Sequence, residues 1–258
     1  MKTVGLIAAM PQEIAPFLRR AGPYERFKIA EFSAYRFRLF ELDCVLVRCG
    51  VGLGRAKSAS RALMAAARPE VLVSFGVAGA VRPGLQVGDV VLGKSACLLD
   101  EAAVAECYVP LAQIPLSAQQ AISQALQARR AGFFPGAILT TGGSQVVPAL
   151  PPQVVNPLLE METAGIAQVA ATDGVPLLGL RAVSDSVDQP LPFDLAAFYD
   201  EQQNLRIGRL VAMMVRNPQV LAKSVRFGRN VKLALENLAV ALCEMIKHMD
   251  TCEEKMVR

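Results

Sequence analysis

Three acidic residues follow segments that have the apolar composition of buried strands. Glu13 lies shortly after the run 3–9, Glu162 directly after the short run 158–161, and Asp185 just after the run 175–183. The glycine-rich segment 76–79 follows a further predicted strand at 71–75. In open α/β sheets the loops at the carboxyl ends of the strands converge, and ligands bind there. We therefore expect the three carboxyl groups to share one site.

Such a set of carboxyl groups suits the cleavage of the N-glycosidic bond of a purine nucleoside. One acid can protonate the departing base at N7, and one carboxylate can orient or deprotonate the attacking water. Another can bind the ribose hydroxyls and stabilise the positive charge that develops on the sugar. Asp185, Glu13 and Glu162 are candidates for these roles. Chemistry alone does not select them, because each one singly is more often a helix cap or half of a surface ion pair.

Four segments form an ordered set between residue 3 and about residue 190. They are 5–13, which ends at Glu13; 74–79 followed by 84–91; 159–164, with the pair Met161-Glu162; and 181–185, with the pair Ser184-Asp185. Together they resemble the nucleoside phosphorylase/nucleosidase family, especially its methylthioadenosine/S-adenosylhomocysteine nucleosidase branch. The last two segments are the specific ones, since glycine-rich turns alone are common.

This resemblance implies a role for each of five residues. Asp185 would protonate or hydrogen-bond N7 of the purine, and Ser184 would hold Asp185. Glu162 would bind the ribose hydroxyls, with Met161 packed beneath the sugar. Glu13 would position the attacking water.

Further residues are expected around the substrate on the same basis. Arg181 would support the carboxylate cluster, and Met10 would help to wall the sugar pocket. The turn 76–79 would lie close to the ribose and the water, which makes Val77 and Gly79 substrate-binding candidates. No metal or organic cofactor is implied, because acid–base groups and electrostatic stabilisation are sufficient for the reaction.

The sequence departs from the family pattern at two places near the substrate. Val77 stands where hydrolases of this branch usually carry a hydroxyl residue. The segment 142–146, which contains Gln145, has no aromatic residue to stack on the base, so Phe75 is the alternative stacking candidate. A catalytically silent nucleoside-binding protein therefore stays open as an alternative.

The pattern favours water over phosphate as the nucleophile. Related phosphorylases bind phosphate through an arginine just before the glycine turn, where this chain has Ser74, and through an N-terminal loop that is absent here. Arg48 and Arg55 lie near the glycine-rich turn 50–54 and could restore phosphate affinity, so a phosphorolytic enzyme is the alternative. The glycines of that turn lack the spacing of a dinucleotide-binding motif.

The order strand, turn, helix, strand predicts an α/β fold in a single domain over residues 1–258. The expected architecture is a three-layer α/β/α arrangement with a mixed, mostly parallel central sheet, as in the nucleoside phosphorylases. Pro11 suits the first turn of a helix, and Ser117 suits the N-cap of another. Strands are predicted at 3–9, 71–75, 87–92, 136–141, 158–161 and 175–183, a hairpin-like stretch at 27–32, 35–39 and 44–49, and helices at 55–67, 117–129 and 163–172.

Residues 193–250 are expected to form a helical extension packed on this domain, with a break at Asn217-Pro218. Apolar and basic positions alternate over 216–232, and residues 233–249 follow, which predicts a pair of basic amphipathic helices. The pair could cover the core, pack on a second subunit or lie on a membrane surface. It is similar to a basic extension of hopanoid-associated members of the family, which implies adenosylhopane as an alternative substrate.

Composition argues against several other classes of protein. The chain has 53% hydrophobic and 19% charged residues and a net charge of +4, which fits an aliphatic α/β core and shows no nucleic-acid footprint. The six cysteines form no CxxC pair and the one histidine is His248, so zinc binding and Cys–His catalysis are poorly supported. Without a signal peptide or an apolar stretch of roughly 20 residues, we expect a soluble cytoplasmic protein. The family resemblance favours a homodimer or a larger homo-oligomer.

Overall fold

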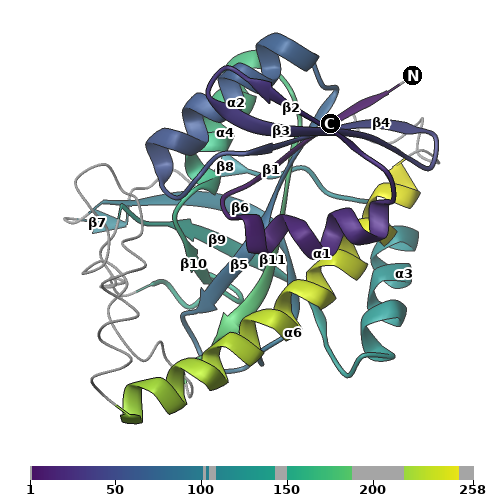
Figure 1. The fold of residues 1–258 in the computed structure, drawn as a ribbon. Helices are drawn as coiled ribbons and strands as arrows, with labels where there is room; N and C mark the ends of the chain where they lie inside the picture. Colours follow the sequence, from purple (N-terminus) through teal and green to yellow (C-terminus); the bar gives the residue numbers. More distant parts are fainter. Residues whose placement is uncertain (1, 101–102, 105–108, 143–149, 188–217, 250–258) are drawn as a thin grey trace.

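The computed structural model describes residues 2–100, 103–104, 109–142, 150–187 and 218–249 (Figure 1). A mixed β-sheet forms the centre of the molecule, and helices cover it. The strands are β1 (Thr3–Ala8), β2 (Glu25–Ile29), β3 (Phe32–Leu39), β4 (Leu42–Arg48), β5 (Val71–Ala80), β6 (Val90–Asp100), β7 (Ala103–Val104), β8 (Val109–Pro110), β9 (Phe133–Thr140), β10 (Leu158–Glu160) and β11 (Leu177–Asp185). The helices are α1 (Pro11–Ala21), α2 (Leu53–Ala67), α3 (Leu116–Gln127), α4 (Thr163–Asp173) and α6 (Pro218–Met249).

The sheet has the order β10-β9-β6-β11-β5-β1-β4-β3-β2. Strands β4, β1, β5 and β11 are parallel to one another, β6 is antiparallel to β11, and β2, β3 and β4 form an antiparallel meander. Because β10 pairs with both β9 and β5, the strands β5, β11, β6, β9 and β10 close into a ring. The predicted α/β class and mixed sheet are confirmed, whereas the strand patterns did not reveal the ring.

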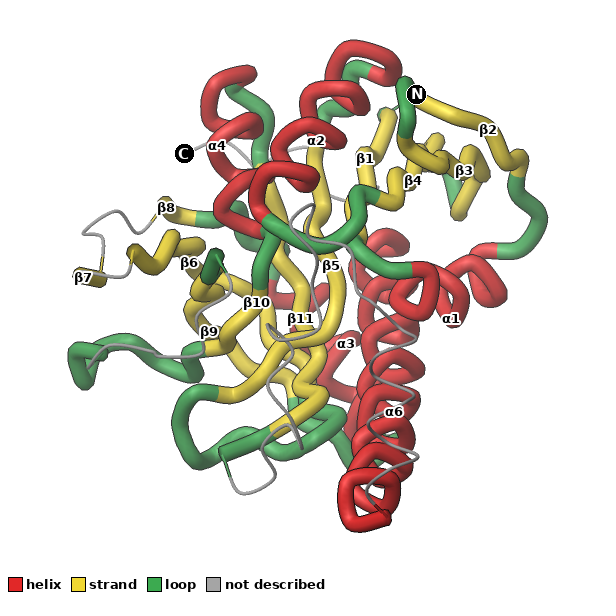
Figure 2. The backbone as a smooth tube through the Cα atoms, turned by 60° about the vertical axis from the view of Figure 1, so that its left-hand side comes forward, coloured by secondary structure: helices red, strands yellow, loops and turns green. Residues whose placement is uncertain are grey.

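The two faces of the sheet carry separate apolar cores. Side chains alternate between the faces of a strand, so Val4 and Leu6 of β1 pack with α1, α3 and α6, while Ile7 packs with α2 and α4. Figure 2 shows α2 and α4 together on one side of the strands and α6 beside α1 and α3 on the other. The apolar run at the start of the chain is therefore buried on both sides, and Pro11 begins α1 as predicted.

Strand β5 continues through the segment 76–79, where the sequence predicts a turn. β11 pairs with β5 as far as Gly79, and β10 pairs with Gly79 and Ala80. Glycines usually weaken a strand, but here they make room for two carboxyl groups. A Cβ atom would lie 2.4 Å from Glu13 Oε1 if built on Gly76, and 2.5 Å from Asp185 Oδ2 if built on Gly79. The turn prediction is wrong because these glycines serve close approach rather than chain reversal.

Two smaller predictions are also wrong. Strand β6 runs on to Asp100 rather than ending at residue 92, because β9 pairs with it over most of this length. Helix α3 begins at Leu116 with Pro115 as its N-cap, so Ser117 already lies inside the first turn.

Helix α6 is one continuous helix, where the sequence pattern predicts a pair. Pro218 is its first residue, and Gly228 in its interior is tolerated at modest cost. The half from residue 234 onward packs on the sheet through Leu235, Leu238 and Leu242. The remaining part of the predicted extension, residues 193–217, lies outside the described residues, so the division of the chain stays a prediction.

Polar contacts also fix α6 on the domain. Asn237 donates to Gly88 O at 2.8 Å and accepts from Arg129 Nε at 2.6 Å. Arg19 and Arg20 of α1 both form ion pairs with Glu236. None of the described helices is long and apolar enough to cross a membrane.

Candidate active site

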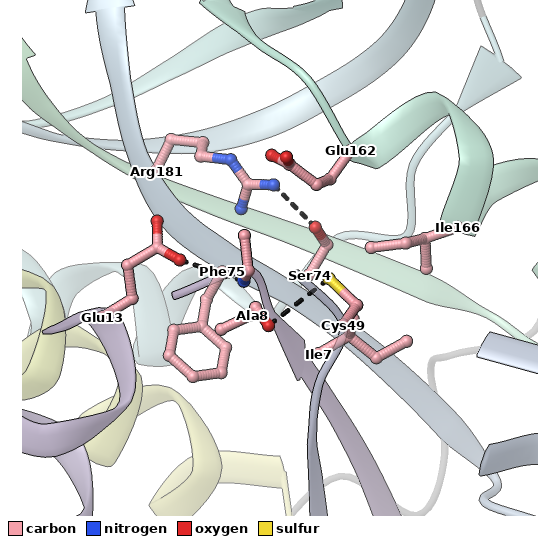
Figure 3. Close-up of a pocket in the computed structure, with 10 residues that line it drawn as sticks. Ile7, Ala8, Glu13, Cys49, Ser74, Phe75, Glu162, Ile166 and Arg181 are labelled. Carbon is pink, nitrogen blue, oxygen red and sulfur yellow. Dashed lines mark hydrogen bonds between the residues drawn. The ribbon is translucent and has the colours of Figure 1, made fainter. Parts of the chain in front are cut away.

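Glu13 and Glu162 lie in one pocket, on two sides of the Arg181 side chain (Figure 3). Glu13 comes from the first turn of α1, Glu162 is the N-cap of α4 directly after β10, and Arg181 belongs to β11. Asp185 is the last residue of β11 and lies beside Gly79 of β5. The pocket is also lined by Ile7, Ala8, Ala9, Cys49, Ser74, Phe75 and Ile166.

Backbone amides from two elements hold the Glu13 carboxylate. Its Oε2 accepts the N–H groups of Ala9 (3.0 Å) and Met10 (2.8 Å), and its Oε1 accepts the N–H of Val77 (3.0 Å). Burial raises the pKa of Glu13, and the backbone hydrogen bonds and Arg181 oppose that rise. Glu13 is therefore a fixed carboxyl group whose basicity is higher than that of an exposed glutamate.

Glu162 is held at the amino end of α2. Its Oε1 accepts the N–H of Gly52, the N-cap of that helix, at 2.7 Å. Burial, and next the negative charges of Glu160 and Glu13, raise the pKa of Glu162 to about 8. This carboxyl group can thus carry a proton near neutral pH and release it when positive charge develops nearby.

Glu160 and Arg181 form a buried ion pair next to Glu162. Glu160 was not among the site residues predicted from the sequence. Glu160 Oε2 lies 2.8 Å from Arg181 Nη2, and the side chains are 2% and 3% exposed. Glu160 also accepts hydrogen bonds from Thr140 Oγ1, from Thr163 N and Oγ1, and from the N–H of Glu162. The alternation of β10 could have revealed it, because Glu160 shares a face with the buried Leu158 and a buried charge needs a partner.

Arg181 connects this ion pair to the pocket. Its Nη2 lies 2.7 Å from both Ser74 Oγ and Thr163 Oγ1, and its Nη1 donates to Leu180 O. Within the described residues, its Nε has no hydrogen-bond partner. The structure thus places Arg181 in the carboxylate cluster and leaves one buried donor for a further oxygen atom.

The carboxyl group of Asp185 is held by its neighbour in β11, Ser184. Ser184 Oγ lies 2.6 Å from Asp185 Oδ1 and 3.3 Å from Ala78 O, and the hydroxyl can donate to either. A register shift between Val183 and Asp185 brings the carboxyl group against Gly79. Burial raises the pKa of Asp185, and the hydrogen bond from Ser184 lowers it. An acid in this environment keeps its proton to a higher pH than an exposed aspartate does.

The structure also describes three residues that were predicted to contact the substrate. Met161 lies between Glu160 and Glu162 and is partly buried, and Met10 is partly buried against the core beneath α2 and α4. Val77 contributes its N–H to Glu13, while its side chain packs against the core of α1, α3 and α6. Val77 therefore meets the proposed water-binding residue through its backbone.

Of the two residues predicted to contact the base, the structure describes only Phe75. The Phe75 ring is 1% exposed and makes an edge contact with Phe17 at 5.8 Å, so it is engaged in the core. In Figure 3 the ring points away from Glu162. This packing argues against a stacking role for Phe75. Gln145 lies outside the described residues.

The cavity between the residues that line the pocket has a volume of about 10 Å³, which is about the space that one water molecule needs. Glu13, Glu162 and Arg181 provide acceptors and a donor around it. Over the described ranges, no group of three or more His, Cys, Asp and Glu side chains could hold a metal ion.

Comparisons with known proteins place this chain in a family. The family model for the Phosphorylase superfamily matches residues 3–216. A 5'-methylthioadenosine/S-adenosylhomocysteine nucleosidase of Marinomonas sp. is 29% identical over 209 residues, covering 74% of this chain and 89% of the relative.

Solved structures agree. The crystal structure of the nucleosidase of the same name from Neisseria meningitidis, in complex with methylthio-immucillin-A, has a TM-score of 0.66 at 25% identity, covering 96% of this chain and 99% of that one. The nucleosidase of that name from Colwellia psychrerythraea 34H, in complex with adenine, has a TM-score of 0.70 at 17% identity, covering 96% and 95% of the two chains, which shows likeness of fold. The resemblance inferred from the four sequence segments is confirmed, and the chain belongs to the phosphorylase superfamily.

Proposed function

We propose that this chain is an N-glycosyl hydrolase that cleaves the base–ribose bond of an adenine nucleoside. The observation that carries the proposal is the placement of Glu13 and Glu162 on two sides of Arg181, with Asp185 partly buried beside Gly79. The relatives that match most of the chain are named as nucleosidases. Three carboxyl groups in one region are more than binding of a nucleoside requires.

Each carboxyl group has a separate task in the proposed reaction. Asp185, whose pKa is raised by burial, donates a proton to N7 as the bond between C1' and N9 breaks and its electron pair moves to the base. Glu162 binds the ribose hydroxyls and, in its ionised form, stabilises the positive sugar. Glu13 accepts a proton from a water molecule as the water oxygen bonds to C1'. The products are free adenine and ribose with its 5' substituent.

The charge of the pocket favours water over phosphate. The guanidinium that lines the pocket, that of Arg181, is already paired with the Glu160 carboxylate, and Glu13 and Glu162 add further carboxyl groups. The pocket therefore offers a phosphate ion little uncompensated positive charge. Arg55 Nε donates to Cys49 O and Arg48 Nη2 to Ser33 Oγ, so both arginines are already engaged with the protein. A phosphorolytic enzyme is the runner-up that this charge distribution disfavours.

The proposed substrate carries an apolar 5' substituent, as methylthioadenosine does. The relatives are named for methylthioadenosine and S-adenosylhomocysteine. A second candidate is a lipid-linked nucleoside such as adenosylhopane, favoured by the exposed basic residues Arg226, Arg229 and Lys232 on α6. These residues would give peripheral contact with an anionic membrane surface.

We further propose that the enzyme acts in the cytoplasm as a homodimer or larger homo-oligomer. The free thiols of Cys44, Cys49 and Cys243 support a reducing compartment. The assembly is proposed from the family, since a single chain is described.

The decisive experiment measures free base released from methylthioadenosine, S-adenosylhomocysteine, adenosine, inosine and adenosylhopane, with and without phosphate. Asp185→Asn should lower kcat by about 10²–10⁴-fold, the range for loss of a general acid. Asp173→Asn, at the exposed end of α4, is the matched control and should leave the rate unchanged.

The outcomes separate the alternatives. Base release without phosphate that is lost in Asp185→Asn supports the hydrolase, whereas dependence on phosphate would make the chain a phosphorylase. A folded protein that releases no base from any purine nucleoside would be a nucleoside-binding protein. Turnover of small nucleosides alone, with no binding to anionic or hopanoid-containing vesicles, would remove the lipid-linked substrate.

A further inference from the structure

Arg82 joins two segments of the chain next to the proposed site. It stands two residues beyond the end of β5, and its guanidinium donates to three backbone carbonyls of one loop. Nη1 donates to Val154 O at 2.8 Å, and Nη2 donates to Leu150 O at 2.5 Å and to Pro151 O at 3.0 Å. Because a guanidinium holds its donors in fixed directions, this one side chain can hold the part of the loop from Leu150 to Val154 in place.

The loop, residues 150–157, depends on such polar contacts. Pro151, Pro152, Gln153 and Val155 are exposed, so burial of apolar surface contributes little to holding them. The later part of the loop is attached to β9, because Ala137 N–H donates to Val155 O at 3.1 Å and Asn156 Nδ2 donates to Pro135 O at 2.9 Å. Arg82 attaches the earlier part to the end of β5.

The loop leads directly into the residues of the proposed site. Val81 N–H donates to Pro157 O at 3.0 Å, after which Leu158 and Leu159 pair with Ala80 and Gly79. Gly79 is the residue against which Asp185 packs. The strand that begins at Leu158 ends just before Met161 and Glu162. Arg82 thus stands where the strand beside the proposed acid meets the segment that carries the proposed ribose ligand.

We infer that Arg82 is a positioning residue that keeps β10 in register with the end of β5 and so fixes the spacing between Glu162 and Asp185. The inference rests on the proposed function, which gives that spacing its purpose. Each carboxyl group has its own local partner, Gly52 N–H for Glu162 and Ser184 for Asp185. Loss of Arg82 therefore leaves the reacting groups intact and lowers the fraction of molecules whose site is ready for substrate.

This mechanism has a kinetic signature. The apparent affinity of a ligand falls in proportion to the fraction of competent protein, so KM should rise while kcat changes little. We expect Arg82→Ala to raise KM about tenfold, the effect of one or two net hydrogen bonds. Arg82→Lys keeps a charged donor group and should give an intermediate KM.

The test measures kcat and KM for base release in the full-length chain, with Arg129→Ala as the matched control. Arg129 also joins two segments through a side-chain hydrogen bond, to Asn237 of α6, but touches none of the proposed site residues. Methylguanidine added to Arg82→Ala should lower KM toward the wild-type value and should not affect Arg129→Ala. Hydrogen exchange at the amides of Val81, Leu158 and Leu159 should be faster in Arg82→Ala than in the wild type.

Each outcome bears on the inference. An active Arg82→Ala enzyme with wild-type KM overturns it, and so does an equal rise of KM in Arg129→Ala, since that would reflect general loosening of the fold. If the wild type itself releases no base, it is the proposed function that has failed. The exchange experiment then decides alone, and unchanged exchange at Leu158 and Leu159 shows that Arg82 holds nothing in register.

Discussion

A methyl group at position 76 tests whether Glu13 must stay where the structure places it. The Cβ of Gly76→Ala would lie 2.4 Å from Glu13 Oε1. An ordinary carbon–oxygen contact is about 3.3 Å, so the carboxylate has to move by roughly 0.9 Å. Gly76 is not among the residues with positive φ, so the backbone itself accepts alanine. The substitution therefore acts on Glu13 and hardly on β5.

The size of the effect follows from what Glu13 contacts. Its Oε1 accepts the N–H of Val77 at 3.0 Å, and a displacement of this size breaks that bond. An unsatisfied buried N–H costs about 1–3 kcal/mol of stability. A catalytic group misplaced by about 1 Å can cost about 10²-fold in rate. We expect kcat to fall about 100-fold with a small decrease in Tm.

The assay compares base release by Gly76→Ala and Gly54→Ala, with thermal unfolding followed by circular dichroism. Gly54 lies in α2, and a Cβ there would meet nothing within 4 Å, so this control should be fully active. A folded Gly76→Ala protein with wild-type kcat would show that the position of Glu13 is not critical. Equal impairment of Gly54→Ala would show that any added methyl group is harmful.

Three further predictions concern the charges of the site. The folded pKa of Glu162, about 8, is above its ordinary 4.5, so its stabilising contribution is complete below pH 4.5 and is lost as the pH rises through 8. The Tm of the unliganded protein should therefore fall over this window, and Glu162→Gln should flatten the profile. Glu160→Gln removes a charge that raises the pKa of Glu162, so the same decline in Tm should move to lower pH; an unmoved decline would contradict the coupling. The Ser184 hydroxyl lowers the pKa of Asp185, so in Ser184→Ala the loss of kcat/KM on the basic side of the pH–rate profile should shift to higher pH, and a shift to lower pH would refute Asp185 as the acid.

The sequence was sufficient to predict the strands that are buried along their whole length. The apolar runs that became β1 and β11 are predicted to within two residues, because both faces of these strands are covered and no polar interruption obscures them. β5 and β6 are longer than predicted because pairing partners far along the chain support residues with weak strand propensity, such as Gly76 and Gly93. Their lengths are set by tertiary contacts, which single-strand patterns do not contain.

The same reason explains which residues of the candidate site could be proposed from the sequence. Glu13, Glu162 and Asp185 could be predicted because they lie in recognisable segments, each at the end of a strand or at the start of a helix. Glu160 was missed because its role comes from Arg181 and Thr140, which are remote in sequence and meet it only in the folded chain. The contact of Phe75 with Phe17 of α1 was not foreseen, because it depends on how that helix packs.

The way in which the carboxyl groups are held gives the site its electrostatic character. Backbone N–H groups bind Glu13 and Glu162, at the starts of α1 and α2 and along β5. The guanidinium of Arg181 is taken up largely by Glu160. The carboxyl groups near the proposed ribose are thus held mainly by backbone dipoles, and their raised pKa values show that nearby cations do not offset their burial. In the proposed reaction, a carboxyl group held in this way and ionised would bind a positively charged sugar more strongly than a neutral one, which is the difference that lowers a reaction barrier.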